Sequence, residues 1–197
     1  HKVDILFHAL GAGVAMHEDK RINALFVETK GGRQAIRADI FIDCSGDGDL
    51  AAWAGAPYEV GDVNGHTLYP SMMFRLNGVD PARAGDAWRT IPQLMEQAEA
   101  RGTHKFPRKG AIVRPQRAGI EWRVNFTQVT RSDGGAISGI DPDEMTRGEI
   151  EGRRQAVEAF KFLRTVPGFE NSYIVDLPPQ LGIRETRRVI GGYMLSG

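Results

Sequence analysis

The segment from Ile40 to Leu50 constrains the fold more than any other part of this sequence. It reads Ile-Phe-Ile-Asp-Cys-Ser-Gly-Asp-Gly-Asp-Leu, so three large apolar residues lead directly into small and acidic ones. Three consecutive apolar residues are typical of a strand that is buried on both faces. The residues that follow predict a turn and then a short helix over about 50–54, started by Asp47 or Asp49 as the cap. In open α/β sheets ligands bind at the carboxyl ends of the strands, so the segment predicts a binding site at its turn.

The composition excludes several classes of protein. The chain has 197 residues, which suits one domain or two small ones. Lys and Arg number 25 and balance 25 Asp and Glu, so the net charge indicates neither a nucleic acid nor an acidic membrane as a partner. No apolar run approaches about 18 residues, so no membrane span is expected. Cys44 is the only cysteine, which excludes an intrachain disulfide and leads us to expect a cytoplasmic protein.

Alternating apolar residues predict a β-meander ahead of this segment. Val3–Phe7 is expected to be a strand, and residues 11–16 and 22–28 are expected to be two more. Gly31-Gly32 suits a two-residue hairpin turn, because both positions accept a positive φ. Residues 36–43 then form a fourth strand that becomes buried at its end. The fold class is therefore mixed α and β.

Later segments predict helices and further strands. Asp80-Pro81 is a helix start, and Pro92 is expected to split the helix that follows into two short ones. Thr146-Arg147-Gly148-Glu149 is a capping box, which predicts a helix from there to about residue 165. Further strands are expected at 110–116, 121–129, 173–177 and 181–190.

Two motifs leave alternatives open. Gly11-Ala12-Gly13 follows a strand-like run and could begin a dinucleotide fingerprint, which would make the protein an NAD-dependent Rossmann oxidoreductase. Met16, at the third glycine position, is too bulky for that motif, so we expect a strand and turn over 14–21 in place of a helix. The histidines have no metal-ligand spacing, and no metal site is expected.

A dense set of charges lies near the end of the sequence, in Arg184-Glu185-Thr186-Arg187-Arg188. One interpretation is a salt-bridged seam between domains, because unpaired charges on an internal strand would cost desolvation energy. The other is recognition of an anion, since guanidinium binds carboxylate or phosphate in a bidentate fork. A non-catalytic structural or anion-binding module is therefore also compatible with the sequence.

Three elements together resemble a known family. They are the run from Arg37 to Asp49, the following Ala54-Gly55-Ala56-Pro57-Tyr58, and the downstream Gly182-Ile183-Arg184-Glu185-Thr186-Arg187-Arg188. This combination is similar to FAD-dependent oxidoreductases of the glutathione reductase superfamily, in the fumarate-reductase-like branch. The resemblance extends from about Val3 to the last residue.

The resemblance implies FAD as the cofactor and hydride transfer between a small-molecule substrate and the flavin. It places Ser45, Gly46 and Asp47 near FAD, and Arg184 and Arg187 near the flavin or an anionic substrate. It also implies that residues 1–58 belong to a Rossmann-type FAD-binding domain with the meander. Residues 59–180 would form a substrate or cap domain, and 181–197 a strand returning toward the FAD domain.

The family's pyrophosphate-binding glycine loop and its second glycine-rich flavin segment have no counterpart in this sequence. We therefore expect the 197 residues to be an internal part of a longer protein and, by themselves, inactive and unable to retain FAD. An apolar surface that the missing parts would cover is expected to favour self-association.

Overall fold

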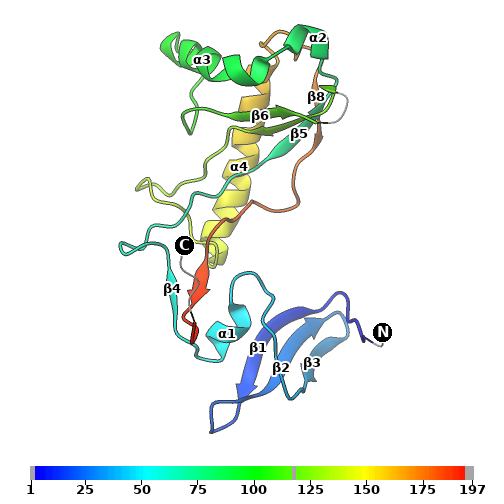
Figure 1. Cartoon of the computed structure of the whole chain (residues 1–197), viewed down its shortest axis with the longest axis vertical. Helices are drawn as coiled ribbons and strands as arrows, with labels where there is room; N and C mark the ends of the chain where they lie inside the picture. The colour runs from blue at the N-terminus through cyan, green and yellow to red at the C-terminus, as the bar shows by residue number, and fades with distance from the viewer. Residues whose placement is uncertain (1–2, 117–118, 194–197) are drawn as a thin grey trace. The chain divides into compact units, whose positions relative to one another are not determined.

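The computed structural model describes residues 3–116 and 119–193. The chain divides into two compact units, one from the described parts of 1–61 and 187–197 and the other from 62–186. Across the described residues there are four α-helices and several antiparallel sheets, which confirms the mixed α and β class (Figure 1). Every strand pair formed by these residues is antiparallel. The described residues therefore form no parallel sheet of the Rossmann type, and the predicted Rossmann-type domain stays a prediction. The assignment of a flavin domain and a substrate domain also stays a prediction.

The first unit contains the predicted meander, which is drawn in blue in Figure 1. Its strands are β1 (Leu10–Met16), β2 (Ile22–Thr29) and β3 (Gly32–Ile36), in the order β1-β2-β3. Thr29 pairs with Gly32, so the hairpin turn lies one residue earlier than predicted. Because β1 is a strand and a turn follows it, the helix that an NAD fingerprint requires is absent at residues 14–21.

Two predicted strands of this unit are not strands in the structure. Val3–Phe7 and residues 37–44 have no regular secondary structure. Most of their apolar side chains are exposed, with Phe7 at 75% and Ile42 at 81% of full exposure, while Phe41 is half-buried. An apolar run becomes a buried strand only when neighbouring strands take up its backbone hydrogen bonds, and no described strand pairs with either segment. The prediction of a buried strand ending at Cys44 is therefore wrong for this structure, and Cys44 itself is exposed.

A short helix and a two-stranded ladder complete the first unit. Helix α1 (Asp49–Trp53) confirms the predicted short helix, and Gly55, at a φ of 79°, closes it. Strands β4 (Tyr58–Val60) and β9 (Arg187–Val189) pair antiparallel. The strand predicted over 181–190 is thus reduced to β9.

The second unit is built on a four-stranded sheet in the order β6-β7-β5-β8. The strands are β5 (Phe74–Asn77), β6 (Ile112–Pro115), β7 (Trp122–Asn125) and β8 (Tyr173–Asp176). Alternate residues of the central strands point into one apolar core shared with the helices. Its largest buried side chains include Trp122, Phe74, Phe126, Phe169, Leu76, Ile91 and Leu163.

The helices of this unit begin at other residues than the sequence predicts. Asp80 caps α2 (Pro81–Ala84) as expected, but the break to α3 (Ala87–Ala100) falls at Gly85 and Pro92 lies inside α3. Helix α4 (Pro142–Leu163) begins at its cap Asp141, before the predicted capping box. Asp141-Pro142 is the same kind of start signal as Asp80-Pro81. The helix begins there, and Thr146 therefore lies inside the helix and is not its cap.

Candidate functional site

The loop between residues 43 and 49 is organised by the carboxylate of Asp43. One of its oxygens accepts hydrogen bonds from Ser45 N, at 3.0 Å, and from Ser45 Oγ, at 2.7 Å. The other accepts from Ala51 N in α1, at 2.9 Å. Ser45 Oγ in turn accepts from Asp49 N at 3.0 Å. Asp43 and Ser45 therefore supply the hydrogen bonds at the start of α1 that the sequence assigned to Asp47 or Asp49 as a cap.

Two glycines give the loop its shape, each for a different reason. Gly48 precedes α1 with a φ of 64°, and a Cβ there would lie 3.0 Å from Val189 Cγ2. Gly46 has a φ of 88°, and a Cβ there would meet no atom of the protein within 4 Å. The positive φ favours glycine at both positions; a side chain at Gly48 would also crowd Val189, while the backbone at Gly46 faces open space that a ligand can approach.

Arg187 ties β9 to this loop. Its guanidinium forms an ion pair with Asp49 Oδ1 at 2.6 Å and donates to the carbonyl of Asp47 at 3.2 Å. The guanidinium carbon lies 5.5 Å from the ring centre of Tyr58 on β4. The side chain is only 14% exposed, and its Nε is buried without a partner among the described residues. This geometry favours the salt-bridge interpretation for Arg187.

The pKa shifts of Asp43 and Arg187 both favour the charged form. Burial by itself would raise the pKa of Asp43, but the hydrogen bonds from Ala51 and Ser45 outweigh it and hold that pKa below its usual range. For Arg187, burial favours the neutral form, and the hydrogen bonds to Asp49 and Tyr58 raise the pKa above its ordinary value in spite of it. The loop is therefore held by ionised groups at neutral pH.

Arg184 lies in the second unit, whereas Arg187 belongs to the first. Its Nε donates to the carbonyl of Tyr69 at 3.1 Å, and its Nη2 donates to Ser71 Oγ at 2.6 Å. Ser71 is buried and also accepts a hydrogen bond from Asn125 Nδ2 at 3.2 Å. The residue as a whole is exposed, although its guanidinium is held by the carbonyl of Tyr69 and by the buried hydroxyl of Ser71.

Sequence reasoning found the loop but missed what holds it. The Asp-x-Ser spacing of Asp43 and Ser45 is a known turn signal that would have identified the first of these contacts. Tyr69 and Ser71, which orient Arg184, are more than a hundred positions away in sequence and carried no signal.

Comparison with known proteins assigns the family. The model of the FAD dependent oxidoreductase family matches residues 1–197, so the chain belongs to that family of flavin-dependent enzymes. Neither a search of curated proteins nor one of solved structures gave a match. In the part of the chain that the structure describes, no helix is both long and apolar enough to cross a membrane.

The geometry of the loop is compatible with the predicted contact to FAD. Its glycine backbone at Gly46 is accessible, and hydrogen bonds and an ion pair fix the surrounding backbone. Two hollows on this unit are lined by residues from 6–10 and 28–34, and neither includes a residue of the loop. The backbone at Gly46 is thus open to a ligand, and contact between Ser45, Gly46 or Asp47 and FAD stays a prediction.

Proposed function

We propose that the full-length protein is an FAD-dependent oxidoreductase of the glutathione reductase superfamily in which residues 45–47 contact the flavin nucleotide. The family match over the whole chain carries this proposal. When bound, FAD supplies the redox chemistry, which is hydride exchange with a small-molecule substrate. The residues of this chain bind the cofactor and orient it and the substrate.

In this proposal the Ser45-Gly46-Asp47 backbone approaches the cofactor at Gly46, where an added Cβ would meet no atom of the protein within 4 Å. Asp43 fixes the turn from one side, and Arg187 fixes Asp47 and Asp49 from the other. Arg187 is thus a positioning residue that acts through the loop, since its guanidinium already pairs with Asp49.

Arg184 is the residue that we assign to an anionic substrate. Its contacts with Tyr69 and Ser71 fix the plane of the guanidinium, and a fixed plane favours bidentate binding of a carboxylate. Arg184→Ala in the full-length protein should lower kcat/KM by about 10- to 100-fold, the worth of a hydrogen bond to a charged group. It should lower the free energy of unfolding by only about 1 kcal/mol, because the side chain is exposed.

Arg83→Ala is the matched control for Arg184. Arg83 is an exposed arginine of the same unit whose guanidinium pairs with Glu170 at 2.6 Å. This variant should leave kcat/KM unchanged and cost a similar amount of stability. Parallel losses of turnover and stability in Arg184→Ala would instead support a purely structural salt bridge, which is the non-catalytic alternative.

The same proposal makes the 197 residues part of a longer flavoprotein. Exposed apolar side chains at Val3, Ile5, Phe7, Ile40 and Ile42 support it, because such surface is normally covered. We expect the isolated chain to bind FAD weakly and to self-associate. Calorimetry and light scattering test both points, and micromolar FAD affinity in a monodisperse monomer would contradict them.

A further inference from the structure

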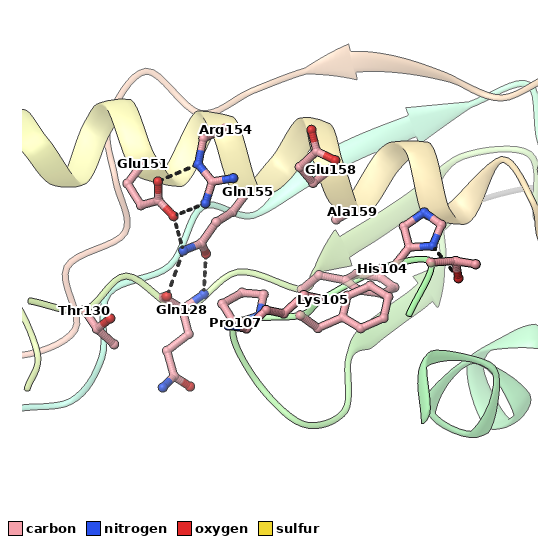
Figure 2. A pocket seen from close by; sticks show the side chains of 13 residues that line it. His104, Lys105, Pro107, Gln128, Thr130, Glu151, Arg154, Gln155, Glu158 and Ala159 are labelled. Carbon is pink, nitrogen blue, oxygen red and sulfur yellow. Dashed lines mark hydrogen bonds and ion pairs between the residues drawn. The ribbon is translucent and has the colours of Figure 1, made fainter. Parts of the chain in front are cut away.

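The second unit contains a pocket of about 560 Å³ that lies outside the loop and arginines described above (Figure 2). Its walls are the segment 103–107, the end of β7 with the residues after it, and the middle of α4 from Glu151 to Ala159. Pockets that bind small molecules usually measure about 300–1,000 Å³. The pocket is therefore large enough for a small organic ligand.

The walls are fixed by hydrogen bonds. The buried side chain of Gln155 accepts from Gln128 N at 2.9 Å and donates to Gln128 O at 3.1 Å, so α4 holds the segment after β7 (Figure 2). On the other side, Phe106 N donates to Glu99 Oε1 at 3.0 Å, and Thr103 Oγ1 donates to the last turns of α3 at 3.1 Å. A ligand would meet a preformed site and pay little to order it.

One wall of the pocket is aromatic. The rings of Phe106 and Phe126 have centres 6.0 Å apart, and the ring of His104 lies within 8° of parallel to that of Phe106. Phe162 packs edge-on against both Phe106 and His104. Phe106 is only half-buried, so part of its ring remains available. Aromatic surface of this kind favours a planar ligand that can stack or meet it edge to face.

One cation that lines the pocket has no ion pair among the described residues. Glu151 is neutralised by Arg154, whose Nε and Nη2 both donate to it, at 2.7 and 2.6 Å. Glu158 pairs with Lys161 at 2.8 Å. Within the described chain, Lys105 has no carboxylate at ion-pair distance, and it lies on the segment that faces the helix (Figure 2). Lys105 is therefore the lining cation that is available to an anionic ligand.

We propose that this pocket binds a small planar aromatic carboxylate, with its ring against the half-buried Phe106, which Phe126 backs from the core, and its carboxylate on the ammonium of Lys105. The site does not depend on the flavin assignment, because every residue that forms it lies in the second unit. Thr130 and Gln128 at the rim add polar groups that can bind a ring substituent.

The test uses 2-naphthoate as the probe, added to the full chain and followed by isothermal titration calorimetry and by amide chemical shifts. Three analogues separate the contributions: 2-naphthamide lacks the charge, 2-naphthylmethylammonium reverses it, and cyclohexanecarboxylate lacks the planar ring. We expect saturable one-to-one binding of 2-naphthoate and weaker binding of all three analogues. Shift changes should centre on residues 103–107 and 126–130.

Lys105→Met removes the cation from an exposed position where it cannot disturb the core. It should weaken 2-naphthoate binding about tenfold, since a hydrogen bond to a charged group is lost, and Lys105→Arg should restore most of the affinity. Lys109→Met is the matched control, because Lys109 is equally exposed and does not line the pocket. Phe106→Leu should weaken 2-naphthoate and 2-naphthamide alike.

Several results would overturn the proposal. Absence of saturable binding at millimolar probe, tighter binding of the ammonium analogue, or equal effects of Lys105→Met and Lys109→Met would each do so. Shift changes confined to other parts of the chain would place the probe elsewhere and refute the site as well. None of these outcomes bears on flavin binding by the loop at residues 43–49.

Discussion

Gly46→Ala tests whether the loop faces the flavin, because its own structural cost can be separated from its effect on binding. The φ of 88° is in the left-handed region, where a residue with a Cβ is destabilised by about 1–2 kcal/mol. The new methyl group would touch no atom of the protein within 4 Å. Any further cost that appears only with FAD must therefore come from the space in front of the loop.

The magnitude follows from packing. Inserting one methyl group into a filled contact typically costs about 1–3 kcal/mol, which corresponds to FAD binding weakened by about 5- to 150-fold. The assay is titration of the full-length apoprotein with FAD, followed by flavin fluorescence, together with chemical unfolding of the same apoprotein.

Gly55→Ala is the matched control for this experiment. Gly55 also has a positive φ, 79°, and a Cβ there would likewise meet nothing within 4 Å, but it lies after α1 and outside the loop. Both variants should lose similar stability, and only Gly46→Ala should lose FAD affinity. Equal affinity in the two variants would refute the reasoning that places the cofactor at Gly46.

Two further predictions concern the charges. Asp43→Ala should speed hydrogen exchange of the Ala51 amide about tenfold, because it removes the carboxylate that caps that N–H, a loss of about 1–2 kcal/mol; an unchanged rate would contradict the assigned role. In the wild type, the pKa of Asp43 is lower in the folded state than its ordinary value of about 4. The stabilisation that the Asp43 carboxylate contributes is therefore complete above about pH 4 and is lost as the pH falls through the lower folded-state pKa. Hydrogen exchange of the Ala51 amide, measured as a function of pH, can follow this loss. Arg123 lies directly opposite both Arg75 and Arg114 in the sheet, so like charges repel there. Arg123→Thr should remove this repulsion and stabilise the second unit by a few tenths of a kcal/mol at low salt. A lower Tm of the variant at every ionic strength, measured by thermal unfolding, would count against this.

Local signals predicted local structure well. The meander, the short helix α1 and the strand pair β6–β7 follow from alternation and glycine placement, which act over a few residues. Asp80-Pro81 also predicted the start of α2, because a capping carboxylate and a fixed φ need no distant partner.

Predictions that needed a distant partner failed. Ile40–Ile42 has the composition of a buried strand, but a strand forms only beside another, and no described strand pairs with it. The same holds for the long strand predicted over 181–190, of which only the part that pairs with β4 forms. The periodicity of a segment shows which secondary structure it is able to form, but whether a strand forms depends on a partner strand beside it.

For the candidate site, too, the local pattern could be recognised from the sequence and the distant contacts could not. The local pattern of small and acidic residues drew attention to this loop, and the family resemblance placed Ser45, Gly46 and Asp47 near FAD, which stays a prediction. The roles of the two arginines could not be separated from the sequence, since both lie in one charged run. Their partners, Asp49 for Arg187 and Ser71 for Arg184, come from distant parts of the chain.

The most direct measurement of the central claim uses Cys44, which is exposed and immediately precedes the loop. The rate of its alkylation by iodoacetamide can be followed by peptide mass spectrometry in the full-length protein with and without FAD. If the loop forms a wall of the flavin site, FAD should slow alkylation of Cys44 by about tenfold or more, the factor that corresponds to 1.4 kcal/mol of protection. Alkylation at the same rate in the FAD-loaded protein and the apoprotein would contradict the claim.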